Sequence, residues 1–130
     1  MDAAASQTNA KKIVLADDEQ FIAIAYKDGL ERAGYQITVA HDGAEALEAV
    51  KTVKPDLVLL DLIMPKLNGF EVLKAIKADD SLKHIPVMIL SNLSQPTDEA
   101  EARQTGALDF IVKADISLKD LTDRIAKVCA

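Results

Sequence analysis

Apolar positions along the chain gather in five short runs, each followed by a longer stretch of mixed polarity. In most of these runs the apolar residues are continuous and do not alternate with polar ones, which is typical of strands buried on both faces of a sheet. The runs are KIVLAD (12–17), QITVAH (36–41), DLVLLD (56–61), VMILS (87–91) and LDFIVK (108–113). We therefore expect five strands.

The stretches that follow the runs place apolar residues at helical spacing, which predicts five helices. The first helix is expected to cover residues 19–33. Its core-facing residues are expected to be Ile22, Ala25, Tyr26, Leu30 and Ala33. The later helices are marked by residues whose side chains can cap a first turn, and these are Asp42, Asn68, Thr97 and Ser117. The helix after Thr97 is expected to be short, residues 98–104.

The strict alternation of strands and helices predicts parallel strand pairing with right-handed crossovers. The fold class is therefore α/β, a doubly wound five-stranded parallel sheet with five helices. Residues 1–10 have no periodicity and are expected to form a disordered N-terminal tail. Residues 11–130 suit a single domain with one core.

The charge of the chain limits its partners. Its net charge is −6 and its sequence pI is about 4.8, which disfavours binding to nucleic acid or to an anionic membrane surface. No apolar run approaches the roughly 20 residues that span a bilayer, and the N-terminus does not resemble a secretory signal. Cys129 is the only cysteine, which fits a reducing compartment. We expect a cytoplasmic protein.

Polar residues follow several predicted strands at their carboxyl ends, where the binding sites of open α/β sheets lie. Asp17 and Asp18 follow the first strand, Asp61 the third, Ser91 the fourth and Lys113 the fifth. If the strand order is 2-1-3-4-5, the first and third strands are neighbours, and their carboxylates converge on one crevice. Singly, each of these residues is better explained as a turn, a helix cap or a solvated side chain. Together they favour a site.

The chemistry of this set indicates phosphoryl transfer. Three carboxylates so close together need a cation, and a small number of oxygen ligands favours Mg²⁺, which also accepts a phosphate oxygen. Ser91 supplies a hydroxyl donor, and Lys113 supplies a positive charge for a phosphoryl group or, without one, for a carboxylate. A carboxylate nucleophile completes what the reaction requires. Asp61, which ends a buried apolar run, is therefore best explained as a phosphoacceptor.

The segments that contain these residues match a known family. They are VLADDE, DLVLLDLIMPKLNGFEVL, VMILS and TGALDFIVKA. From about Lys12 to Val128 the chain resembles the receiver domains of bacterial two-component response regulators, specifically the single-domain kind typified by the chemotaxis regulator. The resemblance implies a flavodoxin-like fold with strand order 2-1-3-4-5, and it identifies residues 11–130 as a receiver domain.

The resemblance also implies roles for the residues at the strand ends. Asp61 would accept a phosphoryl group from the phosphohistidine of a sensor histidine kinase or of a histidine phosphotransfer protein. Asp18 and Asp61 would bind Mg²⁺ directly and Asp17 through water. The backbone carbonyl of Ile63 would be a further Mg²⁺ ligand.

A conformational switch is implied as well. Ser91 and Lys113 would contact the phosphoryl oxygens, and Phe110 occupies the family's switch position. Movement of Ser91 toward the phosphate would free space for Phe110 to turn inward and alter the surface of the fourth helix, fifth strand and fifth helix. Because the chain ends with its last predicted helix, we expect output through a downstream protein target. We expect a monomer or weak dimer that catalyses only its own phosphorylation and autodephosphorylation.

Two residues depart from the family pattern. Ala114 follows Lys113 where the family usually has proline, often with a cis bond, so the loop after the fifth strand is expected to differ in shape. Asn92 follows Ser91 where alanine is common, and its larger polar side chain is expected to change access to the phosphate. Neither departure removes a catalytic group.

Other functions stay open beside the switching receiver. The chain can be a phosphorelay intermediate, or a receiver that no longer switches and serves as a scaffold. A Mg²⁺-dependent phosphohydrolase of the haloacid-dehalogenase type is less favoured, because Ile63 stands where those enzymes usually carry a second acid. A flavodoxin-like binding module is disfavoured, because the acidic residues 17–19 would repel a phosphate.

Overall fold

The computed structural model describes residues 10–92 and 96–129. Its strands form one parallel sheet in the expected order β2-β1-β3-β4-β5. In chain order they are β1 (Lys12–Ala16), β2 (Gln36–Ala40), β3 (Leu57–Leu60), β4 (Val87–Ser91) and β5 (Asp109–Val112). The predicted N-terminal tail, residues 1–10, lies outside the described residues except for Ala10.

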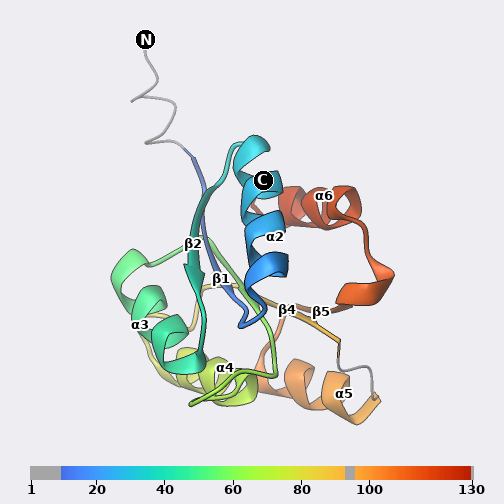
Figure 1. The fold of residues 1–130 in the computed structure, drawn as a ribbon. Helices are drawn as coiled ribbons and strands as arrows, with labels where there is room; N and C mark the ends of the chain where they lie inside the picture. The colour runs from blue at the N-terminus through green and yellow to red at the C-terminus, as the bar shows by residue number, and fades with distance from the viewer. Residues whose placement is uncertain (1–9, 93–95, 130) are drawn as a thin grey trace.

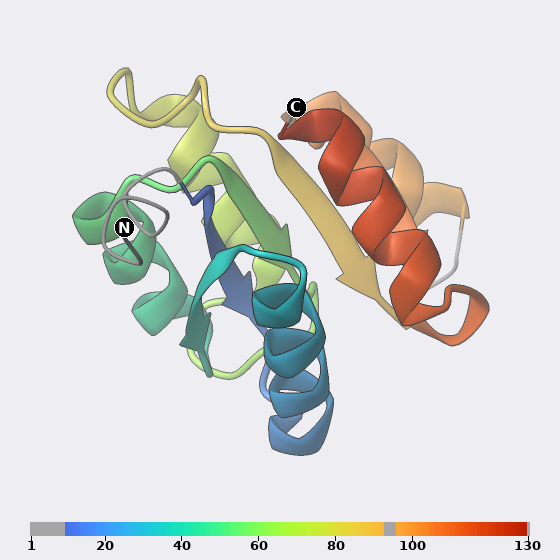
Figure 2. The ribbon, with the colours of Figure 1, turned by 90° about the horizontal axis from the view of Figure 1, so that it is seen from above.

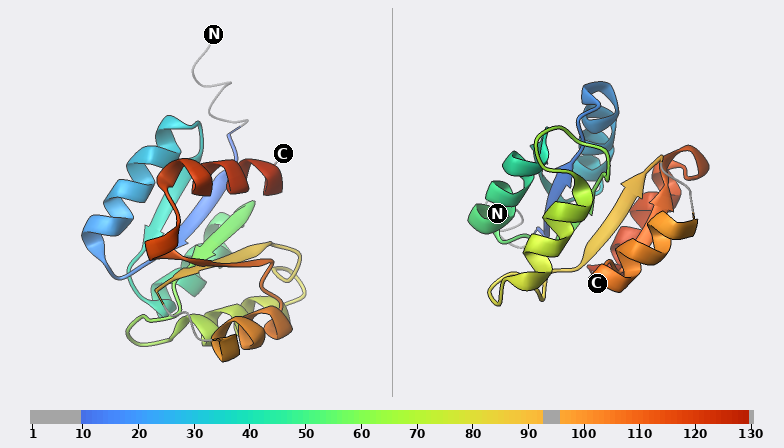
Figure 3. Two further views of the ribbon diagram at one scale, coloured as in Figure 1. Left: turned by 90° about the vertical axis from the view of Figure 1, so that its right-hand side faces the viewer. Right: turned by 90° about the horizontal axis from the view of Figure 1, so that it is seen from below.

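Helices cover both faces of the sheet. Those of the described ranges are α2 (Gln20–Arg32), α3 (Gly43–Val53), α4 (Gly69–Ala78), α5 (Pro96–Thr105), α6 (Leu118–Val128) and the short 3-10 helix η1 (Lys113–Asp115). On one face lie α2 and α6, and on the other lie α3, α4 and α5 (Figures 1 and 3). Figure 2 shows the strands side by side between these layers. The predicted doubly wound α/β fold is confirmed.

Strand residues contribute alternately to two apolar cores. In β1, Ile13 and Leu15 pack with α2 and α6, and Val14 and Ala16 pack with the helices of the opposite face. All four are buried, as is every residue of β3. Because both faces of the central strands are covered, apolar residues are required at every position.

Three of the four predicted helix caps are confirmed. The side chains of Asp42, Asn68 and Ser117 accept a hydrogen bond from the backbone N–H three residues further on, at 2.8, 3.0 and 3.1 Å. Thr97 is not a cap, because α5 begins one residue earlier, at Pro96. The fixed φ of proline suits the first position of a helix.

The buried face of α2 differs from the predicted one. Ala23 and Leu30 are buried, and Tyr26 packs against the same core. Ala25 and Ala33 are exposed, so their predicted inward orientation is wrong. Successive helix positions are about 100° apart, and a face that contains Ala23, Tyr26 and Leu30 turns Ala25 outward.

The described helices also bear on the membrane question. None of them within residues 10–92 and 96–129 is long and apolar enough to cross a bilayer.

Candidate functional site

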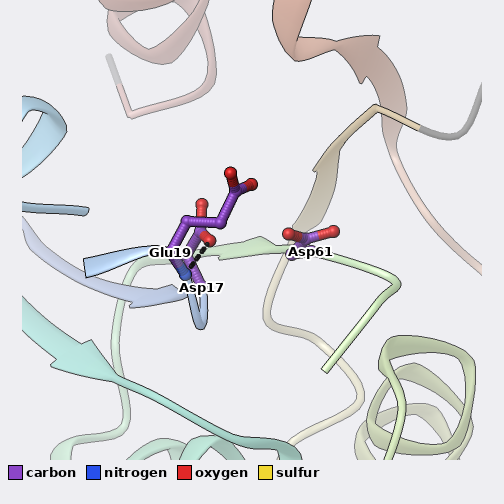
Figure 4. Close-up of side chains that lie close together, drawn as sticks. All are labelled: Asp17, Glu19 and Asp61. Atoms are coloured by element: carbon purple, nitrogen blue, oxygen red, sulfur yellow. Dashed lines mark hydrogen bonds between the residues drawn. The ribbon is translucent and has the colours of Figure 1, made fainter. Parts of the chain in front are cut away.

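Two aspartates leave neighbouring strands at the same level of the sheet. Ala16 of β1 and Leu60 of β3 are partners in the parallel register, so the next residues, Asp17 and Asp61, come side by side. The backbone N–H of Asp61 donates to the carbonyl of Ala16 at 3.0 Å, which extends the ladder by one step. Both carboxylates are buried, with side-chain exposures of 1% and 5%. Figure 4 shows them together with Glu19.

Lys113 reaches these aspartates from the end of β5. Its side chain is only 4% exposed, and its Nζ lies 2.7 Å from Asp17 Oδ2 and 2.9 Å from Asp61 Oδ2. A third carboxylate, that of Glu19, lies 2.9 Å from the same nitrogen. An ammonium has three N–H donors, so these three carboxylates match its full donor capacity.

Glu19 takes a place in this cluster that the sequence analysis did not assign to it. Carboxylate oxygens of Asp17, Glu19 and Asp61 lie within 4.8 Å of one another. Asp18, one of the predicted Mg²⁺ ligands, is exposed and does not join that group. In the turn that follows β1, the N–H of Glu19 donates to Asp17 Oδ1 at 2.9 Å. An aspartate often accepts a hydrogen bond from the backbone N–H two residues further on, which forms a common turn. The spacing of Asp17 and Glu19 was therefore the sequence signal that could have placed Glu19 beside Asp17.

An open cleft lies above Asp61. It has a volume of about 230 Å³ and is lined by Asp18, Glu19, Asp61, Ile63 and Asn92. The side chain of Ile63 is 56% exposed, and Asn92 is exposed as well. Asp18 thus faces the same space as Asp61, and Ile63 and Asn92 border any group bound to Asp61.

Ser91 and Phe110 lie on the adjacent strands β4 and β5. Ser91 ends β4 and is fully buried, in register with Val112 of β5. Phe110 is partly buried and packs against the core under α3, α4 and α5. Since β4 lies between β3 and β5, Ser91 separates the strand end that bears Asp61 from the strand that bears Phe110.

The loop after Asp61 is held at several points. The N–H of Ile63 donates to Asp61 Oδ1 at 3.1 Å. The N-terminus of α4 approaches so closely that a Cβ on Gly69 would overlap the carbonyl oxygen of Asp61. Lys66 adopts a left-handed φ of 68°, and its Nζ lies 3.4 Å from Asp42 Oδ2 at the start of α3. The loop, α3 and α4 therefore position Asp61 jointly.

The loop after β5 begins at Lys113 itself. It forms the 3-10 helix η1, and the Lys113–Ala114 peptide bond is trans, as are all described peptide bonds.

The electrostatics of the cluster leave excess negative charge. Burial works to lower the pKa of Lys113, but its hydrogen bonds to three carboxylates outweigh this and raise the pKa above the usual lysine range. Burial raises the pKa of Asp17, and its hydrogen bonds to Lys113 and to the N–H of Glu19 oppose the rise. One ammonium cannot neutralise all the carboxylates gathered here. Hard oxygen donors with net negative charge fit Mg²⁺.

The family of the chain follows from its fold, its site and its sequence together. A parallel 2-1-3-4-5 sheet with acidic residues and a lysine at its strand ends is the architecture that the sequence resemblance implied. A family profile described as the response regulator receiver domain matches residues 13–126. The chain belongs to the response regulator receiver family. Receiver domains are signalling modules of two-component systems and not classical enzymes.

Curated relatives include both longer and similar-sized proteins. The alkaline phosphatase synthesis transcriptional regulatory protein PhoP of Bacillus subtilis is 38% identical over 103 residues, 79% of this chain and 42% of PhoP. The polar-differentiation response regulator DivK of Brucella anthropi is 34% identical over 103 residues, 79% of this chain and 84% of DivK. The aligned region therefore covers less than half of PhoP and most of DivK.

Solved structures of receiver domains superpose closely. The receiver domain of the Francisella response regulator 1452 has a TM-score of 0.85 and 33% identity, covering 92% of this chain and 96% of that one. The chemotaxis protein CheY4 of Vibrio cholerae has a TM-score of 0.84 and 28% identity, covering 92% and 98%.

Proposed function

We propose that this receiver accepts a phosphoryl group on Asp61 from a phosphohistidine, in a Mg²⁺-dependent reaction. The observation that most supports this is the 2.9 Å contact between Lys113 Nζ and Asp61 Oδ2 within a buried acid cluster. A carboxylate fixed by a lysine beneath an open cleft is a positioned nucleophile with a cation beside it.

The chemistry needs few protein groups. An oxygen of Asp61 attacks phosphorus, the P–N bond to the donor histidine breaks, and the imidazole leaves with the electron pair of that bond. Lys113 donates hydrogen bonds to the phosphoryl oxygens as charge develops. Mg²⁺, when bound, supplies positive charge that screens the carboxylates from the phosphoryl group. Asp18, Asp61 and the backbone carbonyl of Ile63 would hold it directly, and Asp17 would do so through water.

The proposed output is a change of surface. Ser91, buried beside the end of β3, moves toward the phosphoryl oxygens, and Phe110 turns into the space that it leaves. The α5–β5–α6 surface changes shape as a result, and a downstream protein target reads it. Water later hydrolyses the aspartyl phosphate, so the protein acts only in its own phosphorylation and autodephosphorylation.

The proposed setting is the cytoplasm. The partners are a sensor histidine kinase or a histidine phosphotransfer protein, with no nucleic acid or membrane contact. Transfer onward to a second histidine would make the protein a phosphorelay intermediate through the same site. The protein acts as a monomer or weak dimer.

One observation favours a different role. Asn92 lines the cleft next to Asp61, and a side chain that hindered access to Asp61 there would favour a receiver that does not switch and serves as a scaffold. Phosphohydrolase activity has less support, because the cleft wall presents the apolar Ile63, which cannot transfer protons.

Phosphoramidate provides a direct test, since its P–N bond is of the same type as that of phosphohistidine. The protein is incubated with phosphoramidate and Mg²⁺, or with phosphoramidate and EDTA, and its intact mass is recorded. We expect a gain of one phosphoryl group in the arm with phosphoramidate and Mg²⁺, and no gain in the arm with EDTA. An unchanged mass in both arms, together with no complex with beryllofluoride and Mg²⁺ by NMR, would overturn phosphorylation and favour the scaffold.

A further inference from the structure

We propose that Glu19 is a positioning residue that holds Lys113 in the unphosphorylated site and competes with the phosphoryl group for it. The inference rests on the proposed phosphorylation of Asp61 and adds a regulator of that reaction. Lys113 Nζ lies 2.7 Å from Asp17, 2.9 Å from Glu19 and 2.9 Å from Asp61. With three N–H donors and three acceptors, the lysine cannot meet a new oxygen without releasing a present one.

The three acceptors differ in their freedom to leave. The side chains of Asp17 and Asp61 are 1% and 5% exposed, and that of Glu19 is 48% exposed. A buried carboxylate that loses its cation has no water to replace it, which is costly. Glu19 can turn into solvent at little cost. It is therefore the partner that Lys113 gives up first.

The backbone of Glu19 holds its side chain near Lys113. Glu19 occupies the N-cap position of α2, yet its side chain accepts no hydrogen bond from the helix. Its N–H is instead fixed to Asp17 Oδ1 at 2.9 Å, the dashed contact in Figure 4. Short polar side chains such as that of aspartate, when at an N-cap, accept a hydrogen bond from the first turn. Here the carboxylate instead contacts an ammonium 94 residues away.

Competition follows from charge. Oxygens of Glu19 and Asp61 lie within 4.8 Å of each other, so a phosphoryl group on Asp61 places a second anion beside Glu19. The two anions repel each other and need the same lysine donors. Glu19 therefore disfavours the phosphorylated site relative to the unphosphorylated one. Exposed ion pairs are weak, so we expect an effect of about two- to fivefold on affinity.

Beryllofluoride, a stand-in for the phosphoryl group, measures this competition at equilibrium. Its affinity is determined by NMR titration at saturating Mg²⁺ for the wild type, for Glu19→Gln and for Glu48→Gln. Glu48 lies on the exposed side of α3, and its substitution changes net charge equally. Glu19→Gln should bind beryllofluoride about two- to fivefold more tightly, and Glu48→Gln should match the wild type.

A second readout needs neither metal nor phosphate. In the metal-free protein, the Lys113 ammonium protons should exchange with water faster in Glu19→Gln than in the wild type, as measured by ¹⁵N NMR. Unchanged exchange would overturn the proposal, as would equal or weaker beryllofluoride binding by Glu19→Gln. An equal gain in Glu48→Gln would overturn it too. A wild type that forms no beryllofluoride complex would instead overturn the proposed phosphorylation, and the competition with it.

Discussion

Lys113 and Asp61 follow strands that are not neighbours, yet their Nζ and Oδ2 atoms lie 2.9 Å apart. Strand β4 separates β3 from β5, and the lysine side chain spans the end of that strand, where the small residue Ser91 stands. Both side chains are at most 5% exposed. Each buried charge is therefore stabilised by the other. The pair links the end of the central strand β3 to the end of the edge strand β5.

Replacement of Lys113 by alanine should destabilise the protein, because it leaves buried carboxylates uncompensated. Removal of one partner of a buried ion pair typically costs about 3–5 kcal/mol in the free energy of unfolding. We expect a loss of that order by urea denaturation in EDTA, with part of it restored by Mg²⁺. Lys119→Ala, which removes an exposed lysine paired with Asp123, should cause a much smaller loss, because exposed ion pairs contribute little. Equal stability of the two variants would contradict the role of Lys113.

Gly69 should be intolerant of any side chain. Its Cβ would overlap the backbone of Asp61 and Leu62, which cannot move without displacing the proposed acceptor. Gly69→Ala should lower the free energy of unfolding by about 1–3 kcal/mol, as overpacking does, and should weaken beryllofluoride binding.

Gly29→Ala is the matched control for that substitution. The atoms nearest to the new Cβ belong to the side chain of Leu118, which can rotate away. Urea denaturation should show a small change at most, and beryllofluoride binding should be that of the wild type. Equal losses in the two variants would show that Gly69 has no special relation to Asp61.

Asp42 should make stability depend on pH in the acid range. The hydrogen bond from Glu45 N–H, with the nearby Lys66 ammonium adding to it, holds the pKa of Asp42 below its usual 3.8. The unfolded chain therefore binds this proton more readily. The stabilisation is present above the usual pKa and is lost as the pH falls through the folded value.

Asp42→Asn isolates this charge, since asparagine caps helices about as well as aspartate. By urea denaturation, the wild type should be more stable than the variant at neutral pH, and the difference should vanish in acid. A difference that persisted at acidic pH would contradict the assigned charge effect.

Ser91 should transmit phosphorylation to Phe110. In Ser91→Ala, beryllofluoride should still bind in the presence of Mg²⁺, but the change in the NMR signals of Phe110 should be lost. Ser81→Ala removes a hydroxyl bonded to Asp79 and serves as the control with a normal response. If the NMR signals of Phe110 change equally in both variants, Ser91 does not transmit phosphorylation to Phe110.

Local physical rules predicted most of the fold. Apolar runs located the strands, because the central strands are covered by helices on both faces and are built mainly from apolar residues. Cap residues such as Asn68 located helix starts, since their side chains act on the nearest backbone. Strand order came from the family resemblance, because periodicity does not determine which strands are neighbours.

Contacts between distant residues were beyond local rules. Glu19 was missed because its partner, Lys113, lies 94 residues away. The face of α2 was misjudged because apolar residues occur around much of its circumference. Phe21 and Ile24 are 89% and 63% exposed, and only packing against the sheet decides which residues face inward.

The central claim is that Asp61 is the phosphoacceptor, and intact mass tests it most directly. Wild type, Asp61→Asn and Asp56→Asn are incubated with acetyl phosphate and Mg²⁺. Asp56 stands just before β3 and accepts a hydrogen bond from the N–H of Lys12, an interaction that asparagine can keep. We predict one added phosphoryl group in the wild type and in Asp56→Asn, and none in Asp61→Asn. An equal gain in Asp61→Asn would place the acceptor elsewhere and contradict the account.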